Sequence, residues 1–177
     1  TPAKPAGPGP VAQTDDAYLW LETLDSPRVK EFVAAQNART MGLLKSDPSF
    51  PATKAKVAAV MGAQDRLAMP DLNGDYVYNF WKDESHPRGI YRRATLANYR
   101  SANVVWETVL DLDGLAKAEN TSWVWSGIYC LAPENRLCMI SLSKDGKDAS
   151  VFREFDLTAK AFVVGGFVIP ESKTDFA

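Results

Sequence analysis

Residues 76–96, with the sequence YVYNFWKDESHPRGIYRRATL, contain two runs of aromatic and β-branched residues on either side of a polar loop. The runs YVYNFW and GIYRRATL have the composition of β-strands, and residues 83–88 have that of a connecting loop. The stretch therefore predicts a β-hairpin. Apolar side chains fall on both faces of the first run, which is typical of a strand covered on both sides, as in a sandwich or a propeller blade.

Further strand-like runs follow the hairpin as far as residue 169. Clusters of Asn, Asp, Gly and Pro separate them, and this regular punctuation predicts an antiparallel all-β architecture. Their lengths and spacing resemble one and a half to two blades of an incomplete β-propeller. The runs are VVWETVLDL, TSWVWSGIYCLA, RLCMISLS, ASVFREFDL and AFVVGGFVI.

The residues before the hairpin follow a helical period instead. Ser26 is a suitable N-cap before Pro27, and the Asp47-Pro48 pair is a suitable end, so a helix is predicted over residues 27–45. A second helix is predicted over residues 52–64. The expected apolar face has Val29, Phe32, Val33, Gln36, Thr40, Leu43 and Leu44 on the first helix, and Val57, Val60 and Met61 on the second.

The fold class predicted from these patterns is α+β, with N-terminal helices followed by antiparallel propeller blades. Three parts are expected: a flexible leader over residues 1–14, a helical segment over residues 15–70 and the first blades over residues 71–177. The leader is rich in Pro, Ala and Gly and lacks a packing period. It favours a periplasmic or secreted protein, with a cytoplasmic one as the alternative.

The composition excludes some classes of partner. Twenty basic and 22 acidic residues give a formal net charge of −2, without the basic excess of a nucleic-acid-binding protein. No apolar run approaches the ~20 residues that span a bilayer, so no membrane segment is expected.

Two cysteines, Cys130 and Cys138, flank the sequence APEN. A hairpin centred near Glu134 would bring them opposite each other, where a cross-strand disulfide could form. The favoured interpretation is two buried thiols that act as small hydrophobic residues. Two cysteines and one distant histidine do not supply a zinc site, so neither a metal nor a cofactor is expected.

His86 is the only histidine in the chain, and it lies in the loop of the hairpin. A catalytic histidine needs a nucleophile and an orienting carboxylate within reach. Asp83 and Glu84 are near in sequence, but the serine motif G-x-S-x-G is absent, because Val124 occupies the first glycine position before Ser126. His86 is therefore predicted to be a loop residue, and no catalytic, cofactor-binding or metal-binding residue is assigned.

The other charged and aromatic candidates favour structural roles as well. Asp111, Asp113 and Gly114 match only part of a calcium loop, and a solvated connection with a short helical turn is expected there. Strand alternation separates Arg92 from Arg93, which favours ion pairs over a shared anion site, and the same is expected of Arg88 and Arg100. The tryptophans are expected to pack rather than to bind sugar: Trp81, Trp106, Trp123 and Trp125.

Several ordered motifs resemble the prolyl oligopeptidase family of serine peptidases. The stretch YLWLETLDSPRVKEFVAAQN is similar to the family's N-terminal signature, and GDYVYNFWKDESHPRGIYRRATLANYR to its first propeller strands. WETVLDLDGLA and REFDLTAKAFV continue the match. The matching residues are Trp20, Leu21, Glu22, Pro27, Val29, Phe32, Val33, Asn37, Tyr76, Tyr78, Phe80, Trp81, Pro87, Arg88, Gly89, Arg92, Arg93, Trp106, Leu110 and Asp111.

This resemblance implies the non-catalytic N-terminal portion of a serine endopeptidase that cleaves short peptides after proline. In the family, the helical segment packs on a C-terminal α/β-hydrolase domain that carries the Ser-Asp-His triad, and the propeller restricts access to small substrates. No triad residue can be carried over to this chain, which is expected to be inactive alone. The alternative interpretation is a stand-alone binding module that reuses the fold.

The expected partners follow from the same resemblance. They are proline-containing peptides and the missing hydrolase domain. A chain of this length by itself would leave apolar faces uncovered, so it is expected to form a homo-oligomer or to rearrange.

Overall fold

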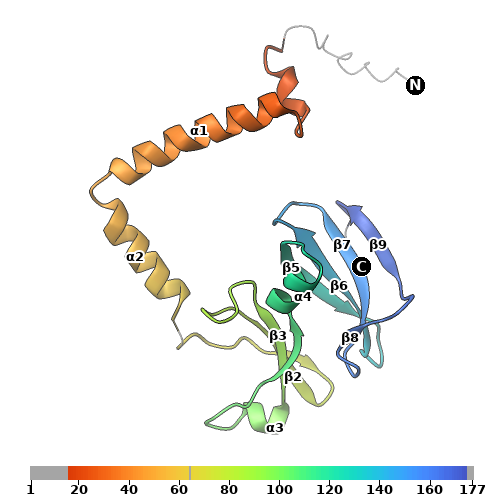
Figure 1. Cartoon of the computed structure of the whole chain (residues 1–177). Coiled ribbons are helices and arrows are strands. Elements are labelled where there is room, and N and C mark those ends of the chain that lie inside the picture. The colour runs from red at the N-terminus through yellow and green to blue at the C-terminus, as the bar shows by residue number, and fades with distance from the viewer. Residues whose placement is uncertain (1–15, 64, 175–177) are drawn as a thin grey trace, which may run out of the picture. The chain divides into compact units, whose positions relative to one another are not determined.

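The computed structural model describes residues 16–63 and 65–174, so the predicted leader lies outside the described residues. The chain divides into two compact units, residues 1–58 and 59–177. The elements are η2 (Leu19–Glu22), α1 (Pro27–Ser46), α2 (Phe50–Met61), β1 (Asp71–Asn73), β2 (Tyr76–Trp81), β3 (Ile90–Thr95), α3 (Leu96–Tyr99), β4 (Glu107–Asp111), α4 (Leu112–Ala118), β5 (Trp123–Cys130), β6 (Leu137–Lys144), β7 (Ser150–Asp156), β8 (Ala161–Phe162) and β9 (Val168–Ser172), as Figure 1 shows.

The first unit confirms the predicted start of α1. The Ser26 hydroxyl accepts a hydrogen bond from the Val29 backbone N–H at 3.3 Å, and Pro27 is the first helical residue. The Trp20 ring packs edge-on against Phe32 with the ring centroids 5.4 Å apart, which anchors η2 to the first turns of the helix.

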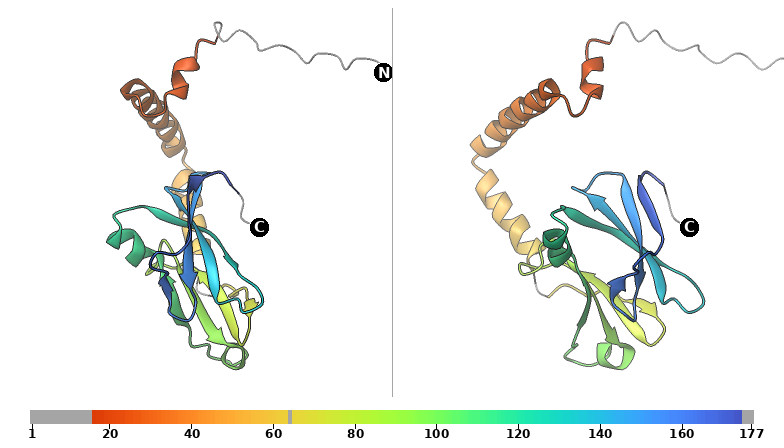
Figure 2. Two further views of the ribbon diagram at one scale, coloured as in Figure 1. Left: turned by 90° about the vertical axis from the view of Figure 1, so that its right-hand side faces the viewer. Right: turned by 45° about the vertical axis from the view of Figure 1, so that its right-hand side comes forward.

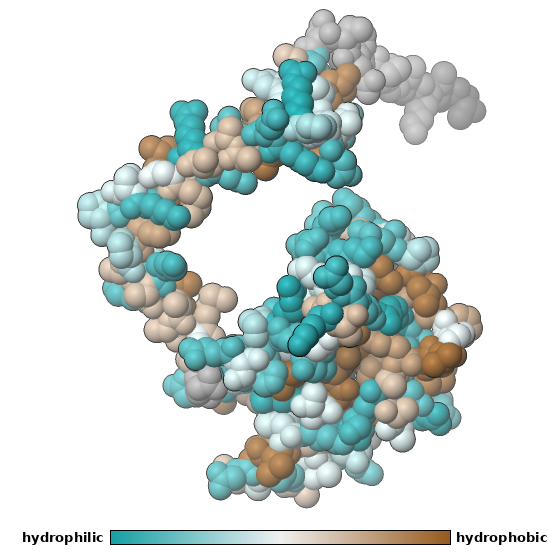
Figure 3. All heavy atoms as spheres, in the orientation of Figure 1, coloured by the Kyte–Doolittle hydropathy of each residue, from teal (hydrophilic) through white to brown (hydrophobic). Residues whose placement is uncertain are grey.

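Within the described residues, the predicted apolar face of these helices is covered only at the start of α1. Val29 is buried and Phe32 is half-buried, because η2 packs over that end of α1. Apart from η2, no described element of this unit covers the remaining apolar side chains of α1 and α2. Figure 3 shows hydrophobic residues exposed along both helices. The exposed positions are Val33, Gln36, Thr40, Leu43, Leu44, Val57, Val60 and Met61.

The second unit contains two antiparallel sheets that lie side by side (Figures 1 and 2). The first sheet has the strand order β1-β2-β3-β4, and the predicted hairpin is its centre, with Tyr76 opposite Thr95 and Trp81 opposite Ile90. In the second sheet the strand order is β5-β6-β7, and both β8 and β9 pair with β7. Two neighbouring antiparallel sheets of this kind confirm the predicted incomplete propeller.

The last predicted strand, residues 161–169, is divided in the structure. β8 and β9 pair with different parts of β7, and residues 163–167 form a turn between them opposite Glu154. Gly165 has a φ of 71°, a conformation that glycine adopts readily. A Cβ on Gly166 would meet the Glu154 carboxylate at 2.7 Å. This glycine pair therefore breaks the predicted strand.

A stack of four aromatic rings fills the space between the two sheets. Tyr78 stacks on Tyr91, Tyr91 stacks on Trp125 of the second sheet, and Trp125 stacks on Phe80. The centroid distances are 5.3, 5.0 and 5.0 Å. Burial raises the pKa of the Tyr91 hydroxyl, so this residue stays neutral within the core. The rest of the core comes from both sheets, from α4 and from the residue after β7: Val109, Leu112, Trp123, Cys138, Ile140, Leu142, Phe155 and Leu157.

Gly89 permits the stack to close against the hairpin loop. Its φ is 108°, and a Cβ at this position would lie only 2.4 Å from Cζ at the tip of the Phe80 ring. The position therefore requires glycine for two reasons, the backbone conformation and the space that the ring occupies.

We expect Gly89→Ala to destabilise the second unit by about 2–4 kcal/mol, because Phe80 must leave its place between Gly89 and Trp125. Gly74→Ala is the matched control: Gly74 also has a positive φ, 58°, but a Cβ there would meet nothing within 4 Å. That variant should cost about 1 kcal/mol. Urea unfolding followed by tryptophan fluorescence measures both, and equal losses would contradict the packing role of Gly89.

Candidate functional site

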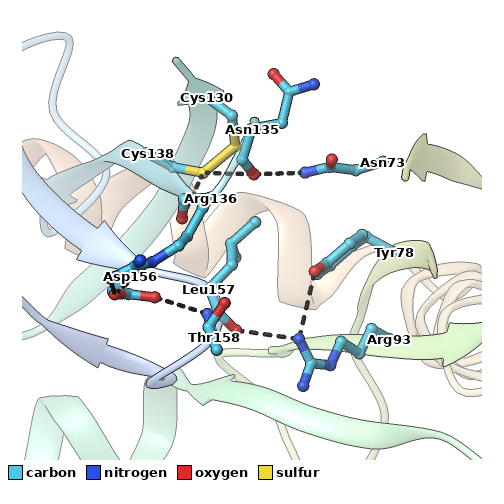
Figure 4. Close-up of a disulfide and its surroundings, with 10 residues drawn as sticks. All are labelled: Asn73, Tyr78, Arg93, Cys130, Asn135, Arg136, Cys138, Asp156, Leu157 and Thr158. Atoms are coloured by element: carbon cyan, nitrogen blue, oxygen red, sulfur yellow. Dashed lines mark hydrogen bonds and ion pairs between the residues drawn. A yellow bond between two sulfur atoms is a disulfide. The ribbon is translucent and has the colours of Figure 1, made fainter. Parts of the chain in front are cut away.

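Arg93 joins the two sheets beside the aromatic stack (Figure 4). Its Nε donates to the Glu107 carboxylate of β4 at 2.6 Å, and its Nη1 donates to the Leu157 carbonyl of the second sheet at 3.0 Å. The guanidinium also lies over the Tyr76 ring, 4.4 Å from the centroid. The side chain is only 12% exposed, so these contacts take the place of water around a buried charge.

Glu107 is shared between Arg93 and a residue of the second sheet. Lys160 donates to its second carboxylate oxygen at 2.7 Å, which makes another connection between the sheets. The hydrogen bonds from Arg93 and then from Lys160 lower the pKa of Glu107 to about 2. Burial lowers the pKa of Arg93, but its hydrogen bonds to Glu107 and Tyr78 outweigh this and raise it.

Asp156 shapes the turn that brings Leu157 to Arg93. One carboxylate oxygen accepts hydrogen bonds from the backbone N–H groups of Thr158 and Ala159, at 2.8 and 3.1 Å. The other accepts from two nitrogens of Arg136, at 3.0 and 2.7 Å. The Arg136 hydrogen bond, followed by that of Ala159, lowers the pKa of Asp156 to about 2.

Cys130 and Cys138 form a disulfide across β5 and β6, so the favoured prediction of two free thiols is wrong. The hairpin that joins these strands is centred near Glu134, as predicted, and it places the two residues directly opposite each other. The adjacent Asn135 carbonyl accepts a hydrogen bond from Asn73 of β1 at 2.9 Å, which connects this loop to the first sheet (Figure 4).

His86 lies in the β2–β3 loop, as predicted. Its Nδ1 is 2.9 Å from Asp83 Oδ1, and its backbone N–H donates to the same oxygen at 2.8 Å. Burial raises the pKa of Asp83, but the hydrogen bonds from His86 and Trp81 outweigh this and hold it below its usual value. The histidine therefore helps to fold the loop around the Asp83 carboxylate.

The predicted arginine ion pairs are confirmed for Arg93 alone. Arg92 lies on the opposite face of the sheet, as predicted, but it stacks between the Trp81 and Trp106 rings, 4.4 Å from each centroid. Burial lowers the pKa of this guanidinium to about 10. The Arg88 Nη1 donates to the Ser122 hydroxyl and the Trp123 carbonyl, and its backbone N–H donates to Asp113. Arg100 is exposed at the end of α3.

The four tryptophans pack as predicted, with Trp81 and Trp123 buried and Trp106 and Trp125 partly buried. The acidic loop folds into α4, where the Asp111 carboxylate caps the helix by accepting from the Asp113 and Gly114 N–H groups. Among residues 16–63 and 65–174, no group of three or more His, Cys, Asp or Glu is placed to hold a metal ion. The helices of the same residues are too short or too polar to cross a membrane.

An apolar groove of about 670 Å³ lies on the face of the second sheet that points away from the first. Met139 and Ile169 line it from the sheet, and the highly exposed Leu131, Phe167 and Val168 line its rim. Figure 3 shows hydrophobic residues on the side of the molecule where β9 lies. Exposed apolar side chains in such number are typical of an interaction surface.

Sequence patterns did not reveal the connections between the sheets. Residues 156–160, with the sequence DLTAK, begin with an aspartate, a residue whose side chain often stabilises a turn. This signal could have predicted the turn after β7. No local signal pairs Arg93 with Leu157 or Lys160 with Glu107, because these residues are 64 and 53 positions apart.

The chain matches the family model "Prolyl oligopeptidase, N-terminal beta-propeller domain" over residues 8–173. It is 42% identical over 159 residues to an uncharacterized peptidase of Sinorhizobium fredii, covering 89% of this chain and 22% of that protein. It is 30% identical over 149 residues to an uncharacterized peptidase of Rickettsia prowazekii, covering 84% and 20%. The chain thus spans about a fifth of the length of these curated relatives.

Solved structures show the same similarity. A post-proline cleaving enzyme from Rickettsia typhi is 29% identical, with a TM-score of 0.76, over 84% of this chain and 22% of that one. A prolyl endopeptidase, 17% identical with a TM-score of 0.62, shares the fold over 82% of this chain and 20% of its own. Both matches include most of the described residues.

We expect Arg93→Met to lower the free energy of unfolding by about 2–3 kcal/mol, because Leu157 and Glu107 lose a buried charged donor while the side-chain volume is kept. Arg100→Met is the control, and this exposed site should change stability by less than about 0.5 kcal/mol. Urea unfolding followed by tryptophan fluorescence measures the difference. An Arg93 variant as stable as the control would exclude this residue as a connection between the sheets.

The lowered pKa of Asp156 predicts that the stability difference between the unchanged chain and an Asp156 variant depends on pH. Its pKa is lowered on folding, so it stabilises the fold above about pH 4, and this contribution disappears as the pH falls through about 2. Asp156→Asn keeps an oxygen for the turn but loses the ion pair with the largely exposed Arg136. The variant should be less stable by about 1 kcal/mol at pH 7. Unfolding at pH 7, 4 and 2 should show this difference shrinking, and a constant difference would contradict the assignment.

Proposed function

This chain belongs to the prolyl oligopeptidase family, as its match to the N-terminal beta-propeller domain shows, and from that premise we propose that it is the non-catalytic N-terminal portion of a serine endopeptidase that cleaves short peptides after proline. The observation that carries the proposal is a single family match that includes both the helical segment and the two sheets. The likeness to a post-proline cleaving enzyme, at 29% identity and a TM-score of 0.76, supports the proline preference.

The chemistry of such an enzyme is acyl transfer through an activated serine. We propose that this triad is supplied by a part of the protein other than the described residues. The contribution of this chain would then be selection by size, because a closed ring of sheets admits only small or extended substrates to a site that it covers.

Selection by size needs sheets that hold their positions relative to each other. The aromatic stack and the Arg93 connections provide this between the first and second sheets. The apolar groove with Leu131, Phe167 and Val168 at its rim provides a second packing face. We propose that another sheet of the same protein covers this face, in the way that the first sheet covers the opposite one.

The exposed apolar side chains of α1 and α2 support a further docking surface. Leu43 of α1 and Val60 of α2 are 66% and 71% exposed. Neighbouring large apolar side chains with this exposure are unusual in a complete folded protein. We propose that the hydrolase domain covers them. If the hydrolase domain is lacking, a homo-oligomer is the expected way to bury the same surfaces.

The test is to isolate the protein as its native source produces it and to measure its intact mass and its peptidase activity. We expect a mass several-fold above 19.5 kDa and cleavage of a short fluorogenic peptide with proline before the scissile bond. An otherwise identical peptide with alanine is the matched substrate, and kcat/KM should fall at least about tenfold. A serine-directed fluorophosphonate should abolish the activity and label a residue outside this chain.

Two results would contradict the proposal. A mass of 19.5 kDa without peptidase activity would favour a stand-alone binding module. Equal cleavage after proline and alanine would be consistent with a peptidase but would contradict the proposed preference for proline.

A further inference from the structure

Residues 66–70, with the sequence RLAMP, form a segment without helix or strand that leads into β1, and we call this segment the strap. The side chains of Leu67 and Met69 are 86% and 71% exposed, so burial of apolar side chains does not hold the strap in place. Its attachment depends on a small number of polar and cation–π contacts. A segment attached in this way can open separately from the core of the fold.

Arg66 attaches the start of the strap to the first sheet. Its guanidinium lies over the Trp81 ring of β2, 4.4 Å from the ring centroid. Its Nη2 donates to the backbone carbonyl of Lys82, and its Nε donates to that of Ala63 at 2.8 Å. One side chain therefore connects the strap to the end of β2.

Two backbone carbonyls attach the rest of the strap. The Tyr99 hydroxyl of α3 donates to the Ala68 carbonyl at 2.9 Å, and the Asn79 side-chain amide of β2 donates to the Met69 carbonyl at 3.0 Å. Asn79 is only 6% exposed, and its Oδ1 accepts a hydrogen bond from Arg92 Nε at 3.1 Å. The position of the Asn79 amide, and with it the attachment at Met69, therefore depends on Arg92.

A row of side chains joins these attachment points. Arg92 stacks between the Trp81 and Trp106 rings, 4.4 Å from each centroid, and Trp106 packs edge-on against Tyr99 with the centroids 5.9 Å apart. The row begins at the contact with Arg66 and returns to the strap at the Tyr99 hydroxyl. We call it the clamp, and it consists of Arg66, Trp81, Arg92, Trp106 and Tyr99.

Two positive charges contact one ring of the clamp, and a carboxylate compensates for their repulsion. Both Arg66 and Arg92 lie over the Trp81 ring. The indole Nε1 of Trp81 donates to the Asp83 carboxylate at 3.1 Å, which places a negative charge beside the ring. The clamp is thus an electrostatically balanced unit rather than two chance contacts.

The strap changes the length of the connection between the helices and the sheets. While the strap is attached, four residues, 62–65, separate α2 from it; once it detaches, nine residues, 62–70, separate α2 from β1. Since one residue spans at most about 3.3–3.6 Å, the greatest reach of this connection increases from about 14 Å to about 31 Å.

We propose that the strap and the clamp form a conformational latch that sets how far the helical segment can move from the first sheet. The closed latch keeps the connection short, and the open latch releases five further residues. This device belongs to the residues of this chain and does not require the peptidase activity proposed above.

The first test is cleavage of the whole protein by trypsin after Arg66, followed by mass spectrometry of the fragments. A protease needs several residues on both sides of the cleaved bond to be detached from the fold, so this cleavage reports the open latch. The variant is Arg92→Met with Tyr99→Phe, which removes the centre of the stack and the hydroxyl that holds Ala68. We expect cleavage after Arg66 to be at least about tenfold faster in this variant.

The matched control is Arg100→Met with Tyr76→Phe, which changes the same residue types. Arg100 is exposed at the end of α3, and Tyr76 packs beside Tyr78 in the core between the sheets. Cleavage after Arg66 in this control should match that in the unchanged protein. Tyr99→Phe alone leaves the stack in place and removes one hydrogen bond, so it should accelerate this cleavage about threefold.

The second test measures the reach directly. Spin labels carried by unnatural amino acids replace Lys56 of α2 and Lys147 of the turn after β6, both of which are exposed. Double electron–electron resonance gives the distribution of distances between them. The longest distances should increase in the double variant by up to about 17 Å, the span of five residues, and should be unchanged in the control.

Three results would overturn the proposal. The first is an equal rate of cleavage after Arg66 in the double variant and the control. The second is an acceleration after Arg93 and Arg153, which lie in β3 and β7, as large as that after Arg66, since this would indicate general unfolding. The third is an unchanged distribution of distances. None of these results depends on whether the protein cleaves peptides, so they leave the proposed peptidase function unaffected.

Discussion

The stacking of Trp125 between Tyr91 and Phe80 is the contact on which the second unit depends. It places one ring of the second sheet between two rings of the first, so that neither sheet can slide without breaking two stacked pairs. Stacked aromatic pairs contribute about 0.5–1.5 kcal/mol each beyond the area that they bury. Gly89 is part of the same contact, because the Phe80 ring occupies the space where any other residue would have a side chain.

Polar contacts at the edge of this core fix the angle between the sheets. Arg93 reaches the Leu157 carbonyl, and Lys160 reaches Glu107 from the other sheet. Both connections are charge-assisted, but only the Arg93 connection is partly buried, so it is expected to be stronger than the exposed pair of Lys160 and Glu107. The selection by size that we propose for this chain would need such fixed angles, because small rotations between sheets would change the width of the entrance.

Local patterns predicted the elements of this fold well, and they failed where distant residues decide the outcome. Ser26 and Pro27 identified the start of α1, since a helix cap depends on a few neighbouring residues. Residues 161–169 were predicted as one strand although the Gly165-Gly166 pair is itself a turn signal, and the Glu154 carboxylate beside Gly166 could not be predicted from local sequence. The alternation rule separated Arg92 from Arg93 correctly, but it could not show that Arg92 would stack between two tryptophans.

The β2–β3 loop contacts both the aromatic core and α4. The Gly89 carbonyl accepts the backbone N–H of Leu112, the first residue of α4, at 3.0 Å, and the neighbouring Arg88 N–H donates to Asp113 in the same helix. The loop that closes against Phe80 therefore also positions the helix that carries Lys117. A rearrangement of the core at Gly89 would therefore move α4 relative to the turn at Asp145, whose backbone N–H donates to the Ser122 carbonyl. Since hydrogen bonds tolerate only small displacements, the position of α4 between the two sheets depends on the packing of the aromatic core.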